Sequence, residues 1–188
     1  RSKYLLGTEN GPYSLDAGLS ILLEAMHLTS PKFDLNQIGQ RLYTENEIKL
    51  INNMANCYIR AGHHYDAIDI LKPLFRYLQV NLKNIPPNRA QIPMVAFNYA
   101  RELEIVKRYD DAIEIAEYAR KICIDYGVYT SLSGILMILA ECYYHLEDFE
   151  KSIELYRQSY YLFKIIEDDR NLIIIKTEAK EFLDLELD

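Results

Sequence analysis

Apolar residues recur every three or four positions along most of the chain, the spacing that places them on one face of an α-helix. In the segment Leu15–Leu28, for example, Leu19, Leu22, Leu23 and Met26 share one face. Glycine and proline are few, with 7 and 6 residues respectively, while leucine, isoleucine, alanine, glutamate and tyrosine are abundant. Long helices joined by short turns have this composition, so the pattern predicts an all-α fold.

Three segments of the chain, beginning at Asn53, Asn98 and Ile138, align with one another without gaps. Each has a small residue near its start and a second small residue twelve positions later, followed directly by isoleucine. An aromatic residue stands two or three positions before the second small residue. In order of first small residue, aromatic residue and second small residue, the three sets are Ala55, Tyr65 and Ala67, then Ala100, Tyr109 and Ala112, then Ala140, Phe149 and Ser152.

This pattern resembles the tetratricopeptide repeat, in which the two small residues let helix A and helix B approach closely and the aromatic residue packs over the hairpin. The resemblance implies a tetratricopeptide-like superhelix of stacked antiparallel helix hairpins. The spacings from Ala55 to Ala100 and from Ala100 to Ala140 are 45 and 40 residues, longer than the usual period of about 34. HEAT-like repeats have periods of this size and are the alternative, but the turn signature favours the tetratricopeptide interpretation.

We expect one tetratricopeptide-like domain over residues 1–188. Its expected parts are a partial N-terminal repeat at 1–43, full repeats at 44–82, 93–127 and 131–167, and a closing helix at 169–186. A capping box predicts a helix start at Thr44 because Glu47 follows three positions later. Gly62 and Gly127 are predicted to end helices. The last three helices are predicted at Leu132–Leu146, Phe149–Ile166 and Asp169–Leu183.

Three features complicate this division of the chain. Asp34–Leu42 is predicted to form a short helical segment. Pro73 falls inside a predicted helix, where it removes a backbone donor and should kink the helix. Asn81–Pro93 is predicted to be a loop in which Pro86, Pro87 and Pro93 act as breakers.

The net charge excludes some partners. Lysine and arginine total 21 and aspartate and glutamate total 28, so the formal charge is −7. Nucleic-acid binding depends on basic side chains that neutralise phosphates, so we expect no nucleic acid and no membrane to bind this domain. The three cysteines, Cys57, Cys123 and Cys142, lie in apolar helical patterns and are interpreted as buried thiols, with a redox or metal role as the alternative. With no signal peptide or membrane span visible, we expect a cytoplasmic location.

Motifs of catalysis are missing from the sequence. It contains no glycine-rich phosphate loop, no G-x-S-x-G and no H-E-x-x-H motif. His63 and His64 are adjacent on a predicted turn and are interpreted as exposed side chains rather than as metal ligands. We therefore predict that the chain is not an enzyme and needs no cofactor.

A binding groove follows from the predicted superhelix, because residues of each helix A line its concave face. Glu104 maps to this face. The candidate peptide-binding residues are Asn52, Asn53, Asn56, Arg60, Phe97, Asn98, Arg101, Met137, Glu141 and Tyr144. An amide offers a donor and an acceptor together, so the asparagines could pair with a peptide backbone. The alternative is that they are solvated or bond to neighbouring helices. Most tyrosines are interpreted as core residues, with a minority available to the groove.

Three runs of sequence carry a further resemblance. Glu47–Ala55, Tyr109–Glu117 and Tyr156–Lys164 resemble the C-terminal domains of Firmicute transcription regulators that have an N-terminal helix-turn-helix of the phage-repressor type. They are similar to the peptide-sensing regulators of the Rgg, PlcR and NprR kind. The resemblance covers the chain from about Leu15 to its end.

The resemblance implies a regulatory domain that forms a homodimer and binds a short peptide or protein segment in its groove. The amides of Asn52, Asn53, Asn56 and Asn98 are then the candidates to hold the peptide. Because the chain begins at Arg1, we also expect that an N-terminal DNA-binding domain is missing from it.

The alternative function is a stand-alone tetratricopeptide scaffold or adaptor that binds a protein partner in the same groove. Such adaptors often present a basic clamp for a carboxylate. Here the basic residues Lys49, Arg60 and Arg101 are accompanied by Glu104 and Glu141, so such a clamp is not evident.

Overall fold

The computed structural model describes residues 14–81 and 91–187, and these residues form helices and connecting turns without a β-strand. The helices are α1 (Leu15–Thr29), α2 (Glu45–Arg60), α3 (His64–Val80), α4 (Gln91–Ile105), α5 (Tyr109–Tyr126), α6 (Leu132–His145), α7 (Phe149–Ile165) and α8 (Asp169–Leu183), with short 3-10 turns η1 (Leu35–Gln37) and η3 (Tyr129–Ser131). The predicted all-α fold is confirmed.

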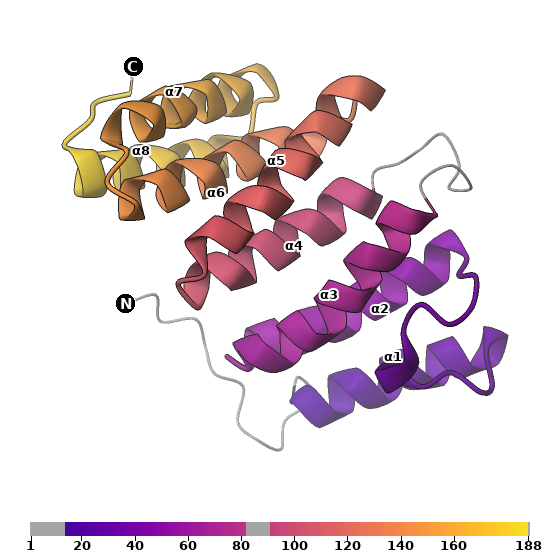
Figure 1. Cartoon of the computed structure of the whole chain (residues 1–188). Helices are drawn as coiled ribbons and strands as arrows, with labels where there is room; N and C mark the ends of the chain where they lie inside the picture. Colours follow the sequence, from indigo (N-terminus) through magenta and orange to yellow (C-terminus); the bar gives the residue numbers. More distant parts are fainter. Residues whose placement is uncertain (1–13, 82–90, 188) are drawn as a thin grey trace. The chain divides into compact units, whose positions relative to one another are not determined.

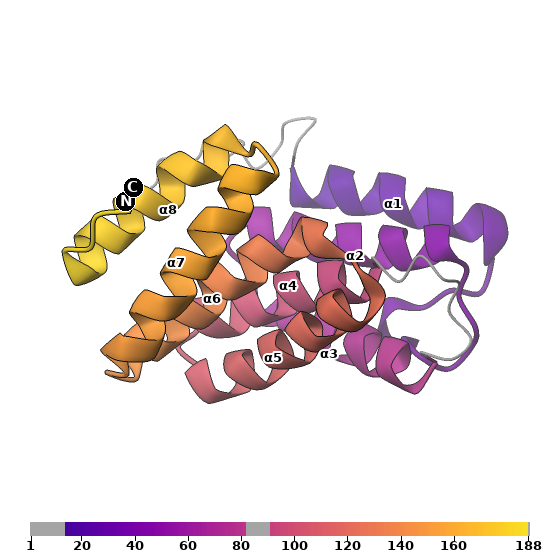
Figure 2. The same ribbon diagram turned by 90° about the horizontal axis from the view of Figure 1, so that it is seen from above.

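The chain divides into two compact units, Arg1–Ile85 and Pro86–Asp188. In the first unit, α1 packs on α2, and α2 pairs with α3. In the second unit, α4 pairs with α5 and α6 pairs with α7, while α8 packs on α7 (Figure 1). Figure 2 shows from above how α7 lies along α6 and is followed by α8.

Local signals placed the helix ends correctly. The Thr44 hydroxyl accepts a hydrogen bond from the Glu47 N–H, and the Glu47 carboxylate accepts one from the Thr44 N–H at 2.8 Å, which confirms the capping box. Gly62 and Gly127 have φ values of +77° and +66°, a left-handed conformation that suits glycine after a helix. The closing helix α8 ends at Leu183, as the helical pattern predicts, and not at 186 as in the division of the chain into repeats.

Two predictions about local structure need correction. Of the predicted helix Asp34–Leu42, only the 3-10 turn η1 forms, because the Asp34 side chain accepts the Asn36 N–H at 2.9 Å and favours a tight turn. Pro93 lies inside α4 rather than in the preceding loop, since proline is tolerated near the start of a helix. Pro86 and Pro87 lie outside the described residues.

The small residues of the repeat pattern lie where the paired helices cross. Ala100, Ala112 and Ala140 have no exposed surface. In the third hairpin the Ser152 hydroxyl donates to the Ala140 carbonyl at 2.7 Å, so the second small position also ties α7 to α6. The aromatic residue of the first hairpin departs from the prediction. Tyr65 is 69% exposed, so it does not pack over the hairpin.

A buried carboxylate joins the loop after α1 to the start of α2 in the first unit. Glu47 accepts hydrogen bonds from Thr29, Ser30 and Arg41 as well as from Thr44. Burial alone would raise the pKa of Glu47, but these hydrogen bonds lower it to about 2. Glu47 is therefore ionised at neutral pH and anchors this turn.

The three cysteines are free thiols, and the predicted burial is confirmed for two of them. Cys123 and Cys142 are buried and Cys57 is half-buried. Burial raises the pKa of Cys123 to about 11. Burial and the nearby charges of Glu104 and Glu141 raise the pKa of Cys142 to about 12. Neither thiol is ionised at neutral pH, which makes both poor nucleophiles.

Within the described ranges, no helix is both long and apolar enough to span a bilayer. The same residues include no group of histidine, cysteine, aspartate or glutamate side chains arranged to hold a metal ion.

Candidate functional site

The second unit carries a cluster of charged side chains on α4, α6 and α8. Arg101 of α4 donates a hydrogen bond to Glu141 Oε2 of α6. Glu104 lies one turn after Arg101 on α4, with its Oε2 atom 3.6 Å from the guanidinium. Their positions follow from helix geometry, because residues three apart share one face. Arg101 therefore connects two carboxylates on adjacent repeats.

A third carboxylate, Glu178, comes from α8. Burial raises the pKa of Glu178, while the charge of Arg101 and the neighbouring Glu141 carboxyl group act in the opposite direction. The cluster is thus one guanidinium with three carboxyl groups, and we call these four residues, Arg101, Glu104, Glu141 and Glu178, the acidic cluster.

Burial within the acidic cluster is uneven. The Glu141 side chain is 5% exposed and that of Glu104 is 11% exposed, whereas Arg101 is 31% exposed. Glu178 is also only half-buried. The cluster consequently reaches solvent through Arg101 and Glu178, while Glu141 lies at its base.

Glu141 is the most perturbed of these groups. Burial raises its pKa, and the charges of Glu178 and Glu104 raise it further, while Arg101 opposes them. The resulting pKa of Glu141 is about 8. At neutral pH the Glu141–Glu178 pair therefore holds one shared proton, as expected for two carboxyl groups that cannot both ionise in a buried setting.

Several polar atoms around this pair lack partners. Among residues 14–81 and 91–187, Glu141 Oε1 and Glu178 Oε2 accept no hydrogen bond from a protein donor. The hydroxyl of Tyr156 on α7 is buried beside them and has no hydrogen-bond partner within the same residues. Buried polar atoms in native proteins are usually satisfied, so this concentration marks a special site.

Aromatic rings border the acidic cluster near the end of α6. Tyr144 stacks on Phe182 of α8 with ring centroids 5.0 Å apart. His145 stacks on Tyr109 of α5 at 4.7 Å, and its Nε2 atom lies 4.0 Å from Glu104 Oε1. The rings of Tyr109, Tyr144, His145 and Phe182 form an aromatic margin, an apolar surface next to the charged side chains.

The predicted groove residues of the second unit have different environments. Arg101 and Glu141 meet directly, and Tyr144, three residues after Glu141 on α6, stacks on Phe182 of α8. Phe97 and Asn98 are half-buried, and the Phe97 ring covers Gly134 of α6. Met137 is only 8% exposed and belongs to the core.

The predicted groove residues of the first unit all lie on α2. Asn52 is 2% exposed, and Asn56 is half-buried, whereas Asn53 and Arg60 are exposed. The Asn56 amide donates to the Asn53 side-chain oxygen at 3.4 Å. Asn52 thus lies in the interior, and Asn53 is the more accessible amide. Their role in peptide binding stays a prediction.

The sequence analysis did not identify Glu178. This residue lies outside the three aligned segments, on the closing helix. A signal was nevertheless present, because Glu178 is the tenth residue of α8 just as Glu141 is the tenth residue of α6. Treating α8 as the helix A of a further, incomplete repeat would have placed the two carboxylates at equivalent positions.

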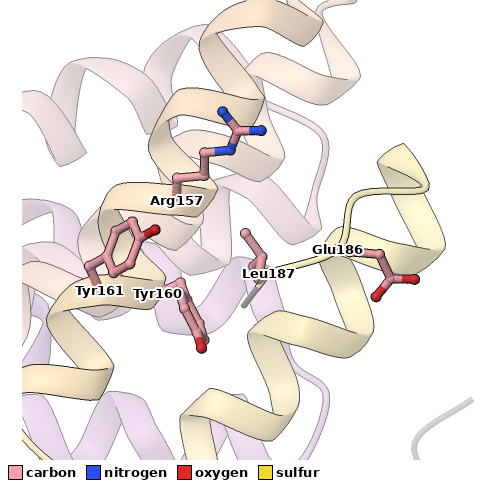
Figure 3. A pocket seen from close by; sticks show the side chains of 5 residues that line it. All are labelled: Arg157, Tyr160, Tyr161, Glu186 and Leu187. Carbon is pink, nitrogen blue, oxygen red and sulfur yellow. The ribbon is translucent and has the colours of Figure 1, made fainter.

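A hollow lies at the end of the chain, between α7 and the tail after α8. Its volume is about 240 Å³, and Arg157, Tyr160, Tyr161, Glu186 and Leu187 line it (Figure 3). Leu187 is 5% exposed and sits toward the α7 side chains, while Glu186 points outward. The hollow is open, and its lining holds the C-terminal tail against α7.

Solved structures share this fold. BtubC (BKLC) from P. vanneervenii superposes with a TM-score of 0.65 at 16% identity over 89% of this chain, which spans 65% of that protein. A second similar structure is a putative kinesin light chain from Podosopora anserina with nearly identical TPR-like repeats. It gives a TM-score of 0.61 at 14% identity, and the match covers 90% of this chain and 84% of that protein. These likenesses confirm the tetratricopeptide-like fold. No family model and no curated protein matches the sequence.

Proposed function

We propose that this chain is the peptide-binding and dimerisation domain of a transcription regulator, and that the peptide binds over the acidic cluster. The observation that carries the proposal is the partly exposed Arg101 beside the buried Glu141 and the half-buried Glu178, each of which has one oxygen without a partner among the described residues. The regulator role is supported by the resemblance of three sequence runs to helix-turn-helix regulators. DNA would be bound by a further N-terminal domain, since the formal charge of this domain is −7.

Energetics support a binding role for the cluster. Moving charged groups out of water costs several kcal/mol per ion, and well-packed apolar residues of similar volume often stabilise a fold as well or better. The α6 residues around Glu141 are otherwise apolar or small, including Ile138 and Cys142. Replacing both Arg101 and Glu141 by apolar residues could stabilise the fold as well or better, so a buried pair with perturbed carboxyl groups favours a functional role.

A stand-alone scaffold or adaptor is the second candidate. It is supported by the likeness of the fold to kinesin light chain-like repeats. The two candidates share the acidic cluster as a binding surface and differ in whether a DNA-binding domain accompanies it.

The peptide proposal is tested with the substitution Arg101→Ala and a matched control, Arg120→Ala. Arg120 has nearly the same exposure, 32% against 31%, and also pairs with a glutamate three residues away. Peptides that co-purify with the chain from its native host are identified by mass spectrometry, synthesised and titrated by calorimetry. Because Arg101 holds Glu104 and Glu141 in place, Arg101→Ala should change the Kd at least about tenfold, and Arg120→Ala should leave it unchanged.

Equal affinities for the two variants would refute the placement of the peptide at the acidic cluster. The regulator assignment is tested separately by reading the gene upstream of Arg1, where a helix-turn-helix is expected. Light scattering of the purified chain should give twice the mass of 22.0 kDa if the domain dimerises.

A further inference from the structure

The acidic cluster carries more negative than positive charge. Arg101 supplies one positive charge against the carboxyl groups of Glu104, Glu141 and Glu178, and Arg101 is already engaged with Glu141 Oε2 and Glu104 Oε2. The opposite oxygen of Glu141 and Oε2 of Glu178 remain without a protein donor within the described residues. These two oxygens are buried acceptors without a donor, so a cationic group that reached them would satisfy both.

The surroundings of this pair restrict which cation fits. Glu141 faces Arg101 and Glu104 from α4, Tyr156 from α7 and Glu178 from α8. A metal ion would lie beside the guanidinium, and the described residues contain no group arranged to hold one. An ammonium or guanidinium at the end of a long apolar stem suits the site better, because its stem can pack on the aromatic margin of Tyr144 and Phe182.

We propose that a basic side chain of the bound peptide, lysine or arginine, inserts between Glu141 and Glu178 and pairs with both carboxylates. The inference rests on the proposed peptide-binding function and names the feature of the peptide that this site selects. On binding, the cation takes the place of the proton that the two carboxyl groups share, and this proton passes to the solvent. The site thus exchanges a proton for a basic side chain.

The first experiment selects peptides without assuming their sequence. A library of random heptapeptides is panned against the whole chain, and each enriched peptide is resynthesised with norleucine in place of each lysine or arginine. Enriched peptides should share a basic residue at one position. Replacing it with norleucine, which keeps the apolar stem, should raise the Kd at least about tenfold, as expected when one partner of a buried charge pair is removed.

Variants of the chain test whether Glu141 and Glu178 cause the preference for the basic peptide over the norleucine peptide. The double substitution Glu141→Gln and Glu178→Gln should abolish the difference between the basic and norleucine peptides. The control, Glu114→Gln with Glu154→Gln, makes the same two substitutions at exposed positions and should preserve the difference. A preference that survives in the Glu141 and Glu178 variant overturns the inference.

A measurement on the unmodified chain covers the case in which the double variant does not fold. Calorimetry in phosphate and in Tris at pH 7 reports proton release from the difference in binding enthalpy. Because the pKa of Glu141 is about 8, the basic peptide should release close to one proton and the norleucine peptide none. Equal proton release by the two peptides overturns the inference.

The library also separates this inference from the proposed function. Enriched peptides without a shared basic residue would overturn the inference and leave peptide binding intact. A library that yields no binder would overturn both.

Discussion

Replacing Glu141 with glutamine should stabilise the protein much more at pH 8 than at pH 5. Glutamine has the shape of protonated glutamate, so its carbonyl can accept from Arg101 and its amide can donate to Glu178. Glu178 keeps the negative charge that balances Arg101 in both proteins. The substitution therefore mimics the folded state of the wild-type chain at low pH.

The size of the effect follows from the pKa of Glu141. The pKa of Glu141 is about 8 in the folded chain, against an ordinary glutamate value of 4.5. Between these values the folded state holds a proton that the unfolded state has released, so the stability of the wild type is full below pH 4.5 and falls as the pH rises toward 8. One proton corresponds to about 1.4 kcal/mol per pH unit. From pH 6 to pH 8 the wild type should lose up to about 2 kcal/mol relative to the variant.

Urea denaturation followed by circular dichroism measures this difference. Both proteins are unfolded at several pH values between 5 and 8, and their free energies of unfolding are subtracted so that other titrating groups cancel. Glu114→Gln, at an exposed site on α5, controls for the change in net charge. A difference that does not vary with pH, or a variant less stable than the wild type at pH 8, would refute the shared proton.

Three further predictions concern packing and local anchors. Glu47→Ala should lower the free energy of unfolding at pH 7 by about 3 kcal/mol in urea denaturation, because it leaves the donors around this carboxylate without an acceptor. In the wild type, the stability that ionised Glu47 contributes should decrease as the pH drops from 4.5 toward 2. Gly134→Ala should lower the stability by about 1–3 kcal/mol, since the added Cβ would lie 2.7 Å from Phe97 Cε2, and Phe97→Leu should restore most of it. Asn52→Ala should lower the Tm measured by calorimetry because Asn52 is buried, whereas Asn53→Ala should leave the Tm unchanged; equal melting temperatures would contradict this.

The helix hairpins could be predicted because their determinants are local. The capping box at Thr44 and Glu47 and the left-handed glycines Gly62 and Gly127 act within a few residues, so sequence alone locates those helix ends. The helix predicted over Asp34–Leu42 failed for a related reason. A side-chain bond from Asp34 to the Asn36 backbone competes with the helix over the same short distance.

The role of each groove residue was less predictable. Asn52 and Asn53 are neighbours in sequence and carry the same amide, yet one is buried and the other exposed. A rotation of about 100° per residue around the helix separates their environments, and only the packing of neighbouring helices decides which direction is interior. Met137 was likewise predicted to line the groove, but the packing of neighbouring helices places it in the core.

The sequence by itself determined the all-α fold, the repeat hairpins and the net acidity of the chain, because periodicity, helix caps and composition are properties of short segments. The tertiary structure alone decided that Arg101, Glu141 and Glu178 would meet. These residues lie on three helices separated by tens of positions, and the shared proton arises from burial and mutual repulsion. Neither property exists until α4, α6 and α8 bring the three side chains together in a setting of low polarity.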